Sequence, residues 1–197
     1  MTRSKKAGSA RGLLIATVLT LGVAPSALAG HVEPPPVPAG LEVPRGNRPF
    51  LLAHAVGTQN YVCLQAGAAW TFLGPQATVF DDESAQVMTH FLSASPAEGG
   101  IHRATWLHSR DSSAAWAMAI ASSSDPDFVA PGAVPWLLLR VTGTGDGPTG
   151  GDRLAPASYI QRVNTEGGTA PAGACATAGA KLFVPYTADY VLYRERR

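Results

Sequence analysis

The end of the chain constrains its fold most, because it carries a strict two-residue alternation. Every second residue from 182 to 192 is apolar, whereas Thr187 and Asp189 lie in the intervening set. This is the period of a strand with one buried face. A second β-rich run at residues 159–163 precedes it, with glycine and proline turn residues between the two. The pattern predicts a closing β-hairpin.

Short apolar runs typical of strands recur through the rest of the chain. Residues 114–121 are rich in helix-forming alanine, but the alternation of Trp116, Met118 and Ile120 favours a strand. Residues 135–141 are continuously apolar, which is typical of a strand covered on both faces. With many Gly/Pro turns and few helix caps, these runs predict an all-β, single-domain β-sandwich or barrel of about eight short, mostly antiparallel strands.

The first residues have the features of an export signal. Four basic side chains precede an apolar run from 13 to 23 and the small-residue pattern Ala27-Leu28-Ala29. The run is shorter than the roughly 20 residues of a membrane span, although an uncleaved anchor is the alternative. We therefore expect a signal peptide at 1–29, a proline-rich arm at 30–49, and a β domain at 50–197. The mature chain is expected to be secreted or extracytoplasmic, without a membrane span.

Two cysteines, Cys63 and Cys175, remain after the signal. In an exported chain they are expected to form a disulfide between the first strand region and the closing hairpin, with two buried free thiols as the alternative. The chain-entropy estimate for so long a loop is about 4 to 5 kcal/mol. Because no Cys-x-x-Cys spacing is present, we assign no metal site and expect no cofactor.

Residues 30–197 hold 11 basic and 14 acidic residues, a net charge of −3. From this balance we expect no basic patch, and we regard nucleic acid and anionic membranes as poor partners.

The most site-like group of side chains is His90, His102, His108 and Asp111. In a straight strand His102 and His108 would lie about 20 Å apart, too far to share a metal. Ser112 or Ser113 could join His108 and Asp111 in a hydrolase, but no Gly-x-Ser-x-Gly elbow is present and a polar turn is the simpler interpretation.

The two strands of the closing hairpin carry four further candidates: Arg162, Asn164, Tyr186 and Asp189. We predict a charge-assisted pair between Arg162 and Asp189 that fixes the register of the hairpin. The alternative is that this hairpin is a recognition face.

Several segments carry a family resemblance: GTQNYVC at 57–63, DSSAAWA at 111–117, PWLLL at 135–139, IQRVNTEGG at 160–168 and VPYTADY at 184–190. With them the chain resembles the DUF3455 family of secreted bacterial and fungal proteins, an uncharacterised family that implies no activity. We expect a non-enzymatic exported β domain that binds an unknown surface component or protein. The alternative is a secreted enzyme or metal-binding protein that uses His90, His108 and Asp111.

Overall fold

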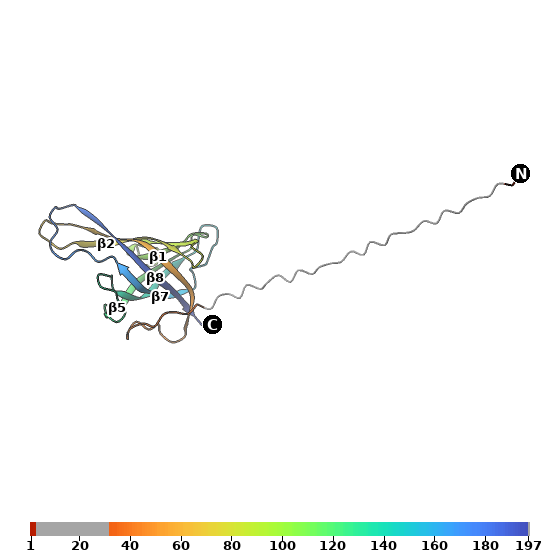
Figure 1. The fold of residues 1–197 in the computed structure, drawn as a ribbon, viewed down its shortest axis with the longest axis horizontal. Coiled ribbons are helices and arrows are strands. Elements are labelled where there is room, and N and C mark those ends of the chain that lie inside the picture. The colour runs from red at the N-terminus through yellow and green to blue at the C-terminus, as the bar shows by residue number, and fades with distance from the viewer. Residues whose placement is uncertain (3–31, 197) are drawn as a thin grey trace. The chain divides into compact units, whose positions relative to one another are not determined.

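The computed structural model describes residues 1–2 and 32–196, so almost all of the predicted signal peptide lies outside the described residues. Within them the chain forms eight strands and one short 3-10 helix, η1 (Pro96–Glu98). The strands are β1 (Asn47–Val62), β2 (Thr71–Phe80), β3 (Gln86–Ser95), β4 (Ile101–His108), β5 (Ala114–Ser123), β6 (Trp136–Gly145), β7 (Ala157–Gly167) and β8 (Lys181–Glu195). Each strand pairs antiparallel with the next, and β8 pairs with β1 to close a barrel (Figure 1). The predicted all-β class is confirmed, and residues 114–121 are strand rather than helix.

The closing hairpin is formed by β7 and β8, as the alternation predicted. Tyr186, Ala188, Tyr190 and Leu192 are each at most 2% exposed and line the inside of the barrel. Residues 182 and 184, in contrast, are only half-buried. The alternation therefore identifies the inward face correctly, and it marks the core over the second half of β8.

The interior is filled by large side chains set against small ones. Trp106, Met88 and Ile160 are fully buried together with Tyr190, and alanines of β1, β2, β5 and β8 face them. A small barrel has room for such rings only where the opposite wall is made of small residues. Burial of each large side chain contributes about 1.5 to 3 kcal/mol.

A second apolar cluster lies on the outer wall of the barrel. It contains Trp136 and Leu138 of β6, whereas Leu139 belongs to the inner core. The strand predicted from the continuous apolar run is therefore covered on both faces, as expected.

The segment before β1 covers part of this outer cluster. Leu41 is 1% exposed within it, and the Gln161 side chain donates a 2.6 Å hydrogen bond to the Leu41 carbonyl. Val37 and Val43 pack beside it, and β1 begins at Asn47. Part of the predicted proline-rich arm thus packs on the barrel, because the valines and the leucine between its prolines are apolar, and β1 begins within the range predicted for the arm.

An up-and-down barrel places its connections alternately at two ends. The connections of 81–85, 109–113 and 146–156, with the start of β1 and the end of β8, form one end, which we call the mouth. The connections of 63–70 and 168–180 lie at the other end, which we call the far end. In Figure 1 the long strand β8 runs from the far end to the C-terminus.

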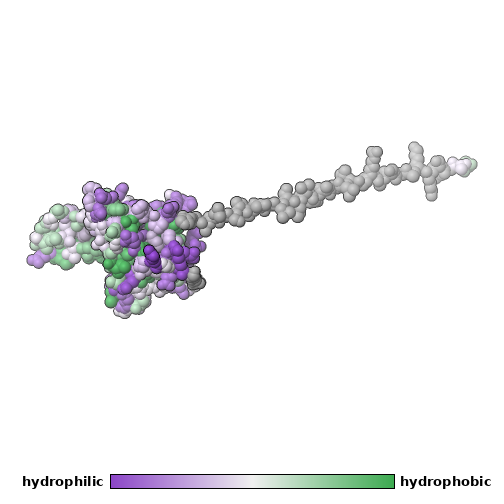
Figure 2. Space-filling model, turned by 90° about the horizontal axis from the view of Figure 1, so that it is seen from below, coloured by the Kyte–Doolittle hydropathy of each residue, from purple (hydrophilic) through white to green (hydrophobic). Residues whose placement is uncertain are grey.

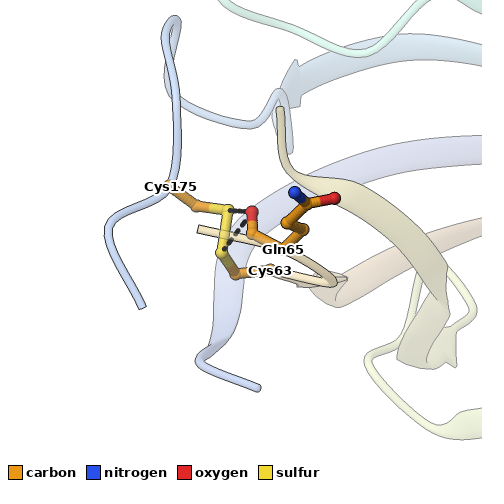
Figure 3. Close-up of a disulfide and its surroundings, with 3 residues drawn as sticks. All are labelled: Cys63, Gln65 and Cys175. Atoms are coloured by element: carbon orange, nitrogen blue, oxygen red, sulfur yellow. Dashed lines mark hydrogen bonds between the residues drawn. A yellow bond between two sulfur atoms is a disulfide. The ribbon is translucent and has the colours of Figure 1, made fainter. Parts of the chain in front are cut away.

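The far end is closed by the disulfide. Cys63 and Cys175 are bonded, with their Cα atoms 5.7 Å apart, which confirms the predicted pairing. Figure 3 shows the Gln65 carbonyl oxygen against both sulfurs, at 3.4 and 3.5 Å. These are contacts rather than hydrogen bonds, since a disulfide sulfur has no proton to donate. The Tyr61 hydroxyl adds a 2.7 Å hydrogen bond to the Gly168 carbonyl, which ties the two connections together.

Candidate functional site

His90 lies in the core of the barrel rather than in a site. Its ring stacks on Trp106 with centroids 4.2 Å apart, and its Nδ1 donates a 2.9 Å hydrogen bond to the Thr105 carbonyl. Tyr190 contacts it edge-on at 5.0 Å. Burial lowers the pKa of His90 to about 3, so the ring is neutral.

His102, His108 and Asp111, the other three residues of the predicted group, do not form one site with His90. His102 is exposed and pairs with Ala94 across β3 and β4. His108 is buried, and its Nδ1 lies 2.9 Å from Asp111 Oδ1 without the alignment of a hydrogen bond. Of the four, only His108 and Asp111 come together. Among the residues that the structure describes, no group of three or more His, Cys, Asp or Glu side chains could hold a metal ion.

The Asp111 carboxylate joins two loops of the mouth by hydrogen bonds. Its Oδ1 accepts hydrogen bonds from the Ser113 amide (3.0 Å) and hydroxyl (2.7 Å), and its Oδ2 accepts one from the Arg153 amide (3.0 Å). Ser113 Oγ in turn accepts a hydrogen bond from the Leu154 amide. Burial raises the pKa of Asp111, but these bonds outweigh it and hold the pKa well below its usual range.

This geometry does not match the hydrolase alternative. The Ser113 hydroxyl donates to Asp111, whereas a nucleophilic serine donates to the histidine. The glycine-rich connection packs against the same aspartate, since a Cβ on Gly151 would lie 2.2 Å from Asp111 Cβ. The glycines are therefore required by the close approach of two loops.

The predicted pair between Arg162 and Asp189 is wrong. Arg162 is opposite Tyr190 and Asp189 is opposite Val163, so the two charges point to opposite faces of the sheet. The Arg162 guanidinium donates to the Pro135 carbonyl at 2.7 and 3.1 Å.

On the outer face, Asp189 belongs to a cluster that the sequence did not indicate. His54 lies between two carboxylates, with Nδ1 2.7 Å from Asp189 and Nε2 2.8 Å from Asp82. Asn164, at a φ of +50° in a bulge of β7, donates to the other oxygen of Asp189 at 2.7 Å. The Asp82 and Asp189 hydrogen bonds raise the pKa of His54. Because residues 54, 82, 164 and 189 lie on four different segments, no local pattern reveals this cluster.

The mouth contains a hollow with a volume of about 1430 Å³. Its floor is the lowest apolar layer of the barrel, which includes Phe50, Leu51, Val87, Val141 and Leu154. Six arginines also line the hollow: Arg48, Arg110, Arg140, Arg153, Arg194 and Arg196. Three carboxylates, those of Asp81, Asp152 and Glu195, lie among them.

Within the described residues none of these six arginines forms an ion pair. Arg194 is half-buried with its guanidinium 5.5 Å from the centre of the Phe50 ring, and the other five are exposed. Elsewhere on the barrel, Arg103 is held by Glu98 at 2.6 Å. In the described structure the one side-chain hydrogen bond that these six guanidinium groups donate runs from Arg140 to the Met118 sulfur at 3.9 Å, so most of their donors are available to other groups.

The arginines of the mouth correct the expectation that no basic patch remains. Six of the 11 basic residues of 30–197 converge there, although the chain as a whole is acidic. They are scattered in the sequence between residues 48 and 196, so no run of basic residues indicates the patch. In Figure 2 the most hydrophilic surface gathers at the end of the domain where Figure 1 places the C-terminus.

A second, shallower hollow of about 950 Å³ lies over β1, β2 and β3. It is bordered by exposed apolar side chains, of which Val56 is 57% and Phe183 is 56% exposed. Lys181 is the basic residue in its lining. It has no convergent polar groups comparable to those of the mouth.

Comparison with known proteins identifies a family and nothing closer. The profile of DUF3455, described as a protein of unknown function, matches residues 44–194. No curated protein and no solved structure matches the chain. In the described residues there is no helix of the length and apolar character that crossing a membrane would require.

Proposed function

Since this chain belongs to the DUF3455 family, whose function is unknown, we propose its function from its geometry: an exported, non-enzymatic β domain that binds an anionic ligand in its mouth. The observation that supports this most is that six arginines, without ion pairs in the described residues, line one hollow.

The chemistry of arginine fits this role. Its planar guanidinium presents five N–H donors and binds a carboxylate or phosphate with two parallel hydrogen bonds. Six arginines face three carboxylates in the mouth, whereas residues 30–197 as a whole are net negative. The positive potential is thus concentrated at one end, which steers an anion there and raises its association rate.

The remaining features are those of a scaffold. The disulfide and the filled interior hold the barrel rigid, and rigid elements carry binding groups with little ordering cost. An oxidised cysteine pair also fits an exported chain.

The test is the affinity of the disulfide-bonded domain for two anionic probes, hexagalacturonate and inorganic polyphosphate, measured by titration calorimetry. At least one probe should bind, more tightly at low than at high salt. Arg110→Gln and Arg140→Gln each should weaken that binding about three- to tenfold, because each removes a charge-assisted contact. Both side chains are exposed, so the fold should be unaffected.

Lys181→Gln is the matched control, since it removes one exposed positive charge at the start of β8, outside the mouth. Its affinity should equal that of the unaltered protein. The proposal is rejected if neither probe binds, or if Lys181→Gln weakens binding as much as the two mouth variants.

A second candidate function is an enzyme that binds the anionic ligand in the same mouth and cleaves it. His108 lines the mouth, with Nδ1 2.9 Å from Asp111 Oδ1, and histidine is a common general base. Under this alternative the bound probe would be cleaved, and His108→Gln would stop the cleavage without weakening binding. Mass spectrometry of the probe after long incubation distinguishes the two functions. An unchanged probe would contradict the catalytic alternative and leave binding as the function.

A further inference from the structure

We infer that the ligand of the mouth is an acidic polysaccharide, a chain of sugars that bear carboxylates. This inference rests on the proposed function and names the class of ligand that the same site takes.

The size and distribution of the site indicate an extended ligand. The volume of about 1430 Å³ exceeds the roughly 300 to 1,000 Å³ of pockets that enclose one small molecule. The arginines come from β1, the 109–113 turn, β6, the 146–156 connection, β8 and the residue that follows it, so several segments contribute positive charge to the hollow. A single small anion can engage two or three of the arginines, whereas a chain with repeated charges can engage most of them.

The floor and wall of the mouth suit sugar rings. Phe50 and Tyr159 both line it and are both half-buried. Arg194 lies over the Phe50 ring, so Tyr159, which packs against the outer cluster, is the ring that offers aromatic surface to the hollow. Aromatic rings provide large apolar contact area, and tyrosine adds a hydroxyl for hydrogen bonding. A sugar presents an apolar C–H face to such a ring, but a polyphosphate chain has no apolar face.

The three carboxylates decide between the two kinds of polyanion. Asp81, Asp152 and Glu195 are hydrogen-bond acceptors only. They would repel a ligand that carries charge on every unit and offers no donors. A polysaccharide carries hydroxyl groups between its charges, and these can donate to the carboxylates while the arginines hold the acidic groups. A mixed rim of arginine and carboxylate is therefore complementary to an acidic sugar chain.

The carboxylates also provide a test in which the two ligand classes give effects of opposite sign. Asp152 and Glu195 are exposed, and no side-chain hydrogen bond ties either of them into the described structure. In the double variant Asp152→Ala/Glu195→Ala, hexagalacturonate should bind about three- to tenfold more weakly, because hydroxyl partners are lost. Polyphosphate should bind more tightly to the same variant, because two negative charges are gone.

The outcomes separate this inference from the proposed function. Methyl-esterified hexagalacturonate, which keeps the sugar rings but lacks the charges, should bind at least about tenfold more weakly than the free acid. If polyphosphate binds in an arginine-dependent way and hexagalacturonate does not, the anion site stands and the polysaccharide inference is overturned. Tighter or unaltered binding of hexagalacturonate by the double variant overturns it as well. If neither probe binds, the proposed function itself fails.

Discussion

The two ends of the barrel are built from different interactions. The far end is held by a covalent bond, Cys63–Cys175, and by the Tyr61 hydroxyl on the Gly168 carbonyl. Gly168 is packed so closely that a Cβ would lie 2.9 Å from both Gln59 and Tyr186. The mouth has no cross-link, and its loops are joined by the hydrogen bonds of Asp111 around an open hollow.

This contrast assigns stability and binding to different regions. A closed, covalently tied end restricts the unfolded chain and positions the strands. The six arginines of the mouth repel one another, and this repulsion lowers the stability of the folded domain. An anionic ligand would relieve it. Changes at the far end should therefore alter unfolding without altering binding, and changes in the rim of the mouth should do the opposite.

The largest effect is expected from removal of the disulfide. The variant Cys63→Ala/Cys175→Ala should lose about 2 to 5 kcal/mol of unfolding free energy, because the unfolded chain gains the freedom of a long loop. Urea denaturation followed by tryptophan fluorescence measures this loss. Under conditions where the variant is still folded, its affinity for an anionic probe should equal that of the unaltered domain. A parallel loss of affinity would show that the two ends are not independent.

Asp111→Ala should have the next largest effect, and it should lower both the stability of the domain and its affinity for an anionic probe. It removes the acceptor of two backbone amides and of the Ser113 hydroxyl, and Ser113 is fully buried. We expect a loss of about 2 to 4 kcal/mol of unfolding free energy together with weaker binding, since the 109–113 turn carries Arg110.

The pH dependence provides the control for this prediction. Because the folded-state pKa of Asp111 is depressed, its contribution is present above the unfolded value of 3.8 and is lost as the pH falls through the folded pKa. The stability difference between the unaltered protein and Asp111→Ala should shrink on acidification. A difference that stays constant with pH would show that the carboxylate charge is not involved.

The smallest effect is expected at His54, on the outer wall between the ends. Its pKa is raised by Asp82 and Asp189, so its contribution is complete below the ordinary value of 6.5 and is lost as the pH rises through the folded pKa. His54 is 42% exposed and Asp82 is 76% exposed, so the contribution should stay under about 1 kcal/mol.

Thermal unfolding at about pH 5.5 and about pH 8.5 tests this expectation against His54→Gln. The unaltered protein should lose a degree or more relative to the variant on going to the higher pH, because the imidazolium becomes neutral. Equal shifts for the two proteins would show that the His54 cluster contributes nothing to stability.

Part of this molecule could be predicted because it depends on local periodicity. The alternation in β8 and the continuous apolar run of β6 report which faces are buried; β6 is covered on both faces, and the predicted face of β8 is buried from Tyr186 onward. The disulfide followed from the presence of two cysteines in a chain that we predicted to be exported. The position of Arg162 did not follow, because a one-residue difference in register moves a side chain to the other face.

The sequence by itself determined the all-β class and the closing hairpin, because the strand period acts within a few residues. It also determined the cysteine pairing, because residues 30–197 contain only two cysteines. Only the tertiary structure decided the site. Closure of the barrel brings residues 48, 110, 140, 153, 194 and 196 to one hollow, and the register of β3 and β4 sets His90 opposite Trp106 and His108 opposite Met88. These arginines lie on different segments, so no local sequence pattern indicates that they converge. The strand order and register alone bring them together.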